Sequence, residues 1–151
     1  MGSFQPGGTV GSAVIQALLE DGRFRITALI RPTSTYTAPS SSITTITADF
    51  NDMASLASAL QDQDAVVCCV GATATMFAPQ KLLIDAAIQA GVKLFFASEF
   101  VSNVFSPQFA VFPPQFVGEK ARIRKYLEEK AAAENGIPSP PSERSDDAAW
   151  T

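Results

Sequence analysis

Residues 7–31 read GGTVGSAVIQALLEDGRFRITALIR, and this stretch decides the fold. After the glycines, apolar residues recur at helical spacing, at Val10, Val14, Ala17 and Leu18. This spacing predicts a helix over residues 9–20, which the pair Asp21-Gly22 ends. The run at residues 24–30 is rich in β-branched and aromatic residues and predicts a strand. A helix followed by a strand in this way predicts one unit of an α/β fold.

The alternation of strand and helix continues along the chain. Further strands are predicted at residues 43–47, 65–70 and 94–97. Further helices are predicted at residues 53–60, 80–90 and 117–134. Asn51-Asp52 is a candidate cap for the first of these helices, and Pro79 and Gly91 flank the second. The alternation predicts a parallel sheet with right-handed crossovers and helices on both faces.

The glycine cluster Gly7-Gly8-Thr9-Val10-Gly11 opens the first predicted helix. The N–H groups in the first turn of a helix have no partner within the helix and carry partial positive charge, so this loop is a candidate phosphate cradle. Gly8 would let a pyrophosphate approach, and Gly11 would let the helix pack closely on the sheet. Gln5 occupies the first position of the spacing Gly-x-x-Gly-x-x-Gly. Turns and helix caps use the same residues, so the cluster alone leaves dinucleotide binding open.

Arg31 follows the predicted strand at residues 24–30, twenty residues beyond Gly11. A dinucleotide-binding fold places there the residue that contacts the adenosine ribose. An acid would select NAD, but no Asp or Glu occurs between Asp21 and Asp49. An arginine can pair with a 2′-phosphate, so the predicted cofactor is NADP rather than NAD. The alternative is a solvated loop arginine.

The composition excludes several classes of function. The chain has 151 residues, 46% of them hydrophobic, and a net charge of −4, which favours one globular domain and argues against nucleic acid or an anionic membrane as a partner. Histidine is absent, so a catalytic proton donor would be a lysine, a tyrosine or a carboxylic acid. Cys68 and Cys69 are adjacent and cannot form a scaffold of spaced disulfides; a reduced, cytoplasmic location is expected.

Three segments resemble the isoflavone reductase-like, NmrA-like family of atypical short-chain reductases. They are DAVVCCVGA at 64–72, QKLLIDAAIQAGVKLFFASEF at 80–100 and EKARIRKYLEE at 119–129. The resemblance implies a Rossmann-like fold with NADPH bound across the carboxyl ends of the strands, and with Val70 and Gly71 along its path. It also implies that Lys120 binds the nicotinamide ribose and serves in proton transfer. No metal site is predicted.

Three features in or beside these segments leave questions open. Phe116 stands four residues before Lys120, where ordinary short-chain dehydrogenases have a tyrosine. Tyr126 and Lys130 spell Tyr-x-x-x-Lys, but Lys130 lies about 15 Å beyond Lys120 along a helix, so we interpret the match as a coincidence. Ser98-Glu99 ends a strand at the ligand edge, where a substrate contact and a structural role are both open.

Both ends depart from the expected pattern. Only residues 1–4 precede the glycine cluster, where a buried central strand is expected in the order 3-2-1-4-5. Without that strand, two apolar strands would face each other across a gap with unpaired backbone groups. We therefore expect an incomplete dinucleotide-binding domain at 1–137 and an irregular tail at 138–151, in a chain that also lacks the family's substrate half. The candidate functions are an NADPH-dependent reductase of a small metabolite, a non-catalytic NADP-sensing regulator with a protein partner, and an inactive fragment.

Overall fold

The computed structural model describes residues 2–4, 6–70, 77–100 and 114–132. Five strands form one parallel sheet in the order β3-β2-β1-β4-β5. The strands are β1 (Gly2–Phe4), β2 (Thr27–Ile30), β3 (Thr44–Thr47), β4 (Ala65–Cys68) and β5 (Leu94–Phe96). The helices are α1 (Thr9–Asp21), α2 (Met53–Ala59), α3 (Phe77–Gln89) and α4 (Pro114–Ala132). The predicted α/β fold, its strand order and its parallel pairing are confirmed.

The central strand is present, although it has three residues. Ser3 of β1 pairs with Ala28 of β2 on one side and with Val67 of β4 on the other. The expectation that β2 and β4 would face an empty gap is therefore wrong. Three residues suffice because the neighbouring strands have only four each, so a short β1 satisfies most of their inner backbone groups.

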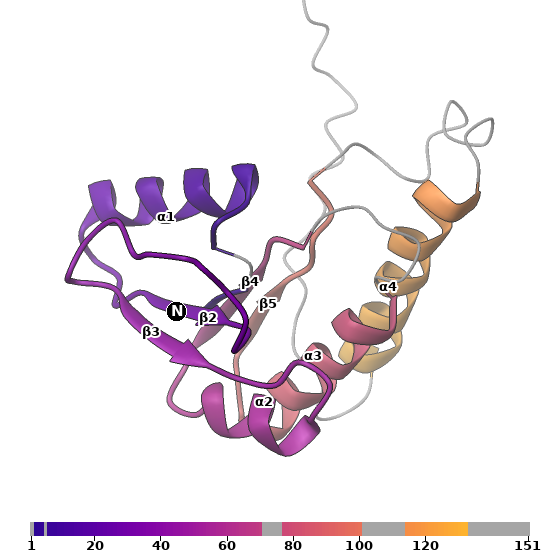
Figure 1. Ribbon diagram of the computed structural model, residues 1–151. Helices are drawn as coiled ribbons and strands as arrows, with labels where there is room; N and C mark the ends of the chain where they lie inside the picture. The colour runs from indigo at the N-terminus through magenta and orange to yellow at the C-terminus, as the bar shows by residue number, and fades with distance from the viewer. Residues whose placement is uncertain (1, 5, 71–76, 101–113, 133–151) are drawn as a thin grey trace, which may run out of the picture.

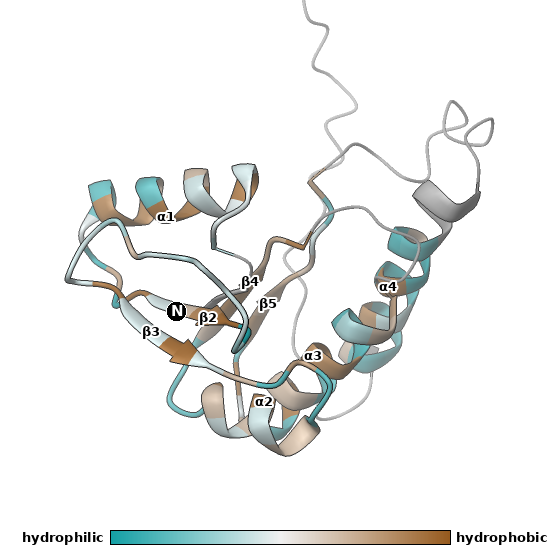
Figure 2. Ribbon diagram, in the orientation of Figure 1, coloured by the Kyte–Doolittle hydropathy of each residue, from teal (hydrophilic) through white to brown (hydrophobic). Residues whose placement is uncertain are grey.

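Helices cover both faces of the sheet, as Figure 1 shows, with α1 on one side and α2, α3 and α4 on the other. Successive side chains of a strand point to opposite faces, so Ala28 packs with Ile15 of α1 whereas Leu29 packs with Leu83 and Ile84 of α3. The larger core lies between the sheet and α2, α3 and α4. In Figure 2, the coloured part of α4 carries both hydrophilic and hydrophobic residues, and the buried Ile123 and Leu127, four residues apart, mark its core-facing side.

Local signals end the helices where the sequence indicated. Gly22 and Gly91 adopt left-handed φ angles of 73° and 74°, directly after α1 and shortly after α3, a conformation that glycine adopts without a Cβ penalty. Asp52 caps α2 by accepting hydrogen bonds from the N–H groups of Ala54 and Ser55, each at 3.2 Å. α3 begins at Phe77, three residues before the predicted start.

The buried face of α1 differs from the predicted stripe. Gly11 and Ile15 are buried, whereas Ala17 is exposed and Val14 only partly buried. The segment that links β2 to β3 runs back along α1, where Tyr36 packs against the same core cluster as Ile15 (Figure 1). The buried stripe is therefore rotated toward Gly11 and Ile15.

Candidate functional site

The glycine loop leads from the carboxyl end of β1 into α1. Gly8 is the N-cap residue, with φ −79° and ψ 166°, and it has no side chain to satisfy the first turn. The first hydrogen bond of the helix runs from the Ser12 N–H to the Gly8 carbonyl at 2.8 Å. The N–H groups of Thr9, Val10 and Gly11 therefore have no acceptor within the helix, and the first turn carries no acid. This helix end favours an anion.

A pocket of about 480 Å³ lies beside this helix end. It is lined by Pro6, Gly7, Gly8, Leu29, Ile30, Arg31, Ser34, Thr35, Tyr36 and Phe50. Its position is the carboxyl edge of the sheet, where the glycine loop leaves β1 and Arg31 leaves β2. Among the described residues that line it, Arg31 is the one charged side chain. The pocket is therefore positively charged, and none of these lining residues brings a carboxylate that would repel a phosphate.

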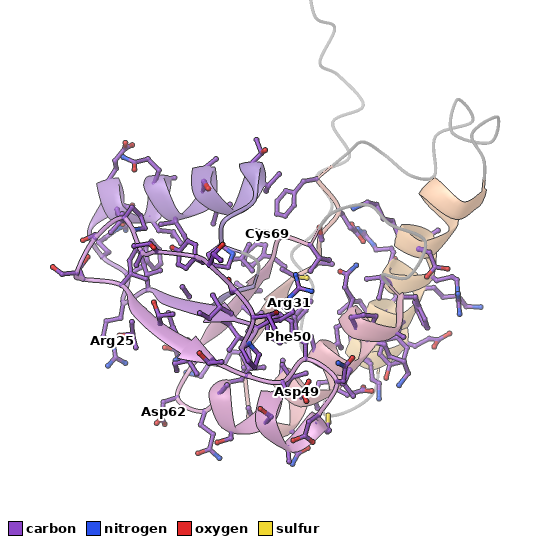
Figure 3. All side chains as sticks on the ribbon, in the orientation of Figure 1. Arg25, Arg31, Asp49, Phe50, Asp62 and Cys69 are labelled. Atoms are coloured by element: carbon purple, nitrogen blue, oxygen red, sulfur yellow. The ribbon has the colours of Figure 1, made fainter. Side chains whose placement is uncertain are left out.

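Arg31 and Phe50 lie next to each other in Figure 3 and both line this pocket. Arg25 and Asp62 lie at the opposite edge of the sheet, in a separate cavity of about 620 Å³ at the amino ends of the strands. The Arg31 carbonyl accepts a hydrogen bond from the Ser34 N–H at 3.0 Å, which turns the chain back over the pocket. The Arg31 side chain is exposed, so a ligand can reach it from solvent.

Tyr36 closes one side of the glycine loop. A Cβ at Gly7 would lie 3.4 Å from the Tyr36 Cδ2 atom, so a larger side chain at Gly7 would meet the ring. The Tyr36 hydroxyl is buried and has no hydrogen-bond partner among the described residues. Burial raises the pKa of Tyr36 above its ordinary value. This wall of the pocket thus contains an unsatisfied polar group.

A second group of polar residues gathers at the ends of β4 and β5. Lys120 of α4 is only 5% exposed, and its ammonium donates a hydrogen bond to the Ser98 carbonyl. The Ser98 hydroxyl donates to the Val70 carbonyl at 2.6 Å. Ser98 therefore connects Lys120 to Val70, two residues that the sequence assigned to the same cofactor.

Burial lowers the pKa of Lys120 below its ordinary value, because a low-dielectric surrounding penalises the ammonium form. Two acidic groups, the Cys68 thiol and the Glu99 carboxylate, oppose this effect when they are ionised. Burial also raises the pKa of Cys68 to about 12, so that thiol is neutral at physiological pH. Lys120 is therefore an ammonium that gives up its proton more readily than a solvated lysine.

Comparison with known proteins agrees with this geometry. A family described as NAD(P)H-binding matches residues 7–151. The chain belongs to this NAD(P)H-binding family. The predicted class of cofactor, a nicotinamide dinucleotide, is thereby confirmed.

Three relatives of this NAD(P)H-binding chain are informative. It is 33% identical over 124 residues to the oxidoreductase aprR of Aspergillus flavus, a match that covers 82% of the chain and 41% of that protein. An isoflavone reductase structure matches with a TM-score of 0.69 and 28% identity, over 87% of the chain and 46% of that protein. The NADPH-dependent quinone oxidoreductase QOR2 of Escherichia coli, solved with NADPH, matches with a TM-score of 0.72 and 26% identity, over 91% of the chain and 46% of that protein. The fold is of the isoflavone reductase type, and the chain spans less than half the length of these relatives.

The NAD(P)H-binding chain brings part of its predicted site together. Gly7, Gly8 and Arg31 line one pocket. Thr9, Val10 and Gly11 form the helix turn beside it, with Gly11 buried. Val70 and Lys120 lie outside the lining of that pocket, at the ends of β4 and β5. The predicted contact at Gly71, the residue Gln5, the side chain of Phe116 and the tail at 138–151 fall outside the described residues.

The contacts of Ser98 and Glu99 within the protein favour a structural role, and a substrate contact at these residues stays a prediction. Ser98 is 4% exposed and uses its N–H, hydroxyl and carbonyl groups in hydrogen bonds within the protein. Glu99 forms an ion pair with Arg124 of α4 at 2.9 Å. Both residues therefore fasten the end of β5 to its neighbours.

Tyr126 and Lys130, the pair spaced as Tyr-x-x-x-Lys, contact α3. The Tyr126 hydroxyl donates to the Asp85 carboxylate, and Lys130 lies 3.4 Å from the same carboxylate. Lys81 completes the cluster, 2.8 Å from Asp85 and 4.9 Å from the centre of the Tyr126 ring. These contacts support the interpretation of the motif as a coincidence, since its residues hold two helices together.

The sequence interpretation missed Phe50 and the segment from Ser34 to Tyr36, which line the pocket. Phe50 follows β3, and all carboxyl ends of a parallel sheet share one edge. The rule that located Arg31 could therefore have located Phe50. No comparable signal marks Tyr36, because a long loop carries it back to the glycines.

The described residues hold neither a cluster of candidate metal ligands nor a helix suited to span a membrane. Among residues 2–4, 6–70, 77–100 and 114–132, no cluster of three or more His, Cys, Asp or Glu side chains could hold a metal ion. Within the same ranges, no helix is both long enough and apolar enough to cross a membrane.

Proposed function

We propose that this chain is the NADPH-binding part of a reductase of the isoflavone reductase type, whose substrate is a small aromatic or carbonyl-bearing metabolite. One observation carries the proposal: Arg31 is the one charged residue among those described around a pocket that Gly7 and Gly8 also line. A ligand with several phosphates suits a lining that offers a guanidinium, unpaired amides beside it and, among these residues, no carboxylate.

The residues present fit NADPH. The pyrophosphate would bind at the first turn of α1, where the N–H groups of Thr9, Val10 and Gly11 have no acceptor within the helix. Arg31 would hold the 2′-phosphate, because a guanidinium presents a planar set of donors to phosphate oxygens. Phe50 supplies an apolar surface to the same pocket. QOR2, one of the relatives, was solved in complex with NADPH, which supports the choice of NADPH over NADH.

Lys120 would serve as the proton donor. NADPH supplies the hydride, and a carbonyl that accepts a hydride also takes up a proton. The Lys120 ammonium lies at the carboxyl edge of the sheet, hydrogen-bonded to Ser98, with a pKa lowered by burial. A donor with a lowered pKa transfers its proton more readily near neutral pH. Lys120 thus favours a reductase over a non-catalytic NADP-sensing protein, because a protein that only senses NADP needs no proton donor.

Calorimetric titration of the full chain with NADPH and with NADH tests the cofactor assignment. We expect NADPH to bind more tightly, and Arg31→Ala to lower NADPH affinity by about tenfold to a hundredfold, the loss of a charge-assisted pair. NADH affinity should be unchanged in Arg31→Ala. Arg25→Ala is the matched control, since Arg25 lies at the other end of the strand, at the opposite edge of the sheet. Equal affinity for both dinucleotides, or an unchanged NADPH affinity in Arg31→Ala, would refute the assignment.

A further inference from the structure

A network of polar side chains lies inside the core that α3, α4 and the sheet enclose. Its members come from four segments and are each 5% exposed or less, namely Cys68, Gln80, Ser98 and Lys120. Polar groups are buried at a cost unless they are hydrogen-bonded, so each contact in such a network has a large effect on the others. The function proposed above assigns a role to Lys120, but it assigns none to Gln80.

Gln80 is 1% exposed on α3, at a position where a leucine would pack against the core without any polar group to satisfy. Its Oε1 atom accepts two hydrogen bonds. The Ser98 N–H donates to it at 3.4 Å, and the Cys68 thiol donates at 3.6 Å. Gln80 therefore joins α3 to the ends of β4 and β5 through one buried oxygen.

Ser98 links Gln80 to Lys120. Its N–H group donates to Gln80, its hydroxyl donates to the Val70 carbonyl at 2.6 Å, and its carbonyl accepts from the Lys120 ammonium. The bonds to Gln80 and Val70 hold the N–H and the hydroxyl of Ser98, and so they help to keep this residue, and with it the carbonyl, in place beside Lys120. The direction of that carbonyl in turn decides how well it accepts from the Lys120 ammonium, because a hydrogen bond weakens as its geometry departs from the preferred angles.

We propose that Gln80 is a positioning residue for Lys120, which it holds at the carboxyl edge of the sheet by keeping Ser98, the acceptor of the Lys120 ammonium, in place. Gln80 touches neither substrate nor cofactor in this scheme. It acts by fixing the acceptor of the Lys120 ammonium. The inference rests on the proposed function, in which Lys120 is the proton donor.

The effect of Gln80 on the pKa of Lys120 can be separated from the effects of the charged groups around Lys120. From β4, the Cys68 thiol faces it and is neutral, since its pKa is about 12. From the end of β5, the Glu99 carboxylate acts on it but is paired with Arg124 of α4 at 2.9 Å. These are the titratable groups that act on Lys120 among the described residues. Gln80 itself has no charge, so its replacement by an uncharged residue changes the hydrogen bonding and leaves the charges alone.

The test measures the pKa of the Lys120 ammonium by NMR, in the full chain with isotope-labelled lysine and without NADPH. The Lys120 signal is assigned by its loss in Lys120→Met. In Gln80→Met we expect a further fall of about 0.5 unit, because the Ser98 carbonyl becomes a less well oriented acceptor of the ammonium. In Gln80→Glu we expect a rise of about one unit or more, because a carboxylate then lies in the same network. Gln89→Met, on the exposed end of α3, is the control and should leave the pKa unchanged.

The fall in Gln80→Met supports the inference, since a residue that only fills the core would not produce it, whereas the rise in Gln80→Glu shows that position 80 lies close enough to act on Lys120. An unchanged Lys120 pKa in folded Gln80→Met would overturn the inference. If Gln80→Met does not fold, Gln80→Leu takes its place, because a leucine packs at this position without a polar group to satisfy. NADPH titration of the unmutated chain separates the two proposals: absent binding refutes the cofactor assignment, whereas an unchanged pKa refutes only the role of Gln80.

Discussion

The Glu119 carboxylate of α4 accepts a hydrogen bond from the backbone N–H of Phe77, the first residue of α3, at 3.1 Å. A side chain distant in sequence thus satisfies the N-terminus of a helix that lacks an acid in its own first turn. Arg122 completes the contact, 2.8 Å from Glu119 and 4.0 Å above the Phe77 ring. The N-terminus of α3 therefore depends on side chains of α4 for its stability.

Glu119→Ala should destabilise the chain by about 1–2 kcal/mol, the usual worth of a helix cap with a favourable charge. Chemical denaturation monitored by circular dichroism measures the change. Glu129→Ala removes an exposed glutamate from the same helix and should cost less than about 0.5 kcal/mol. Equal losses in the two variants would mean that the contact with Phe77 contributes nothing measurable.

The two tyrosines should respond differently to loss of their hydroxyl groups. The Tyr36 hydroxyl is buried without a partner among the described residues, so Tyr36→Phe removes an unsatisfied group and should leave stability unchanged or raise it by about 1 kcal/mol. The Tyr126 hydroxyl donates to Asp85, so Tyr126→Phe should lower stability by about 1–2 kcal/mol. Thermal unfolding of both variants gives the comparison, and a loss of stability in Tyr36→Phe would contradict the assignment of its hydroxyl as unpaired.

Lys120 should make stability depend on pH in the alkaline range. Its pKa in the folded chain is lowered by burial, so between that value and the ordinary value of 10.5 the folded state binds fewer protons than the unfolded state. Stability therefore rises with pH across this window, by about 1.4 kcal/mol for each unit by which the pKa is lowered. Lys120→Met lacks the effect, so the stability of the natural chain should rise relative to the variant as pH increases. Urea denaturation of both chains from about pH 7 to about pH 10 tests this, and parallel curves would exclude a lowered pKa.

Cys68 should resist thiol reagents while the chain is folded. Its side chain is fully buried, and burial raises its pKa to about 12, so almost no thiolate is present at about pH 8. In Cys69→Ser we expect labelling of Cys68 to be at least about 1,000-fold slower than in the same variant unfolded in urea, because it waits for the core to open. Rapid labelling without denaturant would show that the ends of β4 and β5 open readily.

The sequence by itself determined the helices and most of the strands, and the family resemblance supplied the order of the sheet. The helices and strands depend on local chemistry: Asp52 caps α2, glycines end two helices with positive φ angles, and runs of β-branched and aromatic residues form strands. The glycine loop and Arg31 were also found from spacing alone, since the carboxyl ends of parallel strands meet at one edge.

Only the tertiary structure decided three features. These are the face that α1 buries, the pairing of the three-residue β1 with both neighbours, and the hydrogen-bond partners of Lys120. Several faces of α1 are apolar, and packing against β2 buries the one with Gly11 and Ile15. The partners of Lys120 lie on other elements, and no local rule brings Gln80, Ser98 and Lys120 together. Such contacts arise because distant segments share one closely packed core, and there burial and pairing depend on the whole fold.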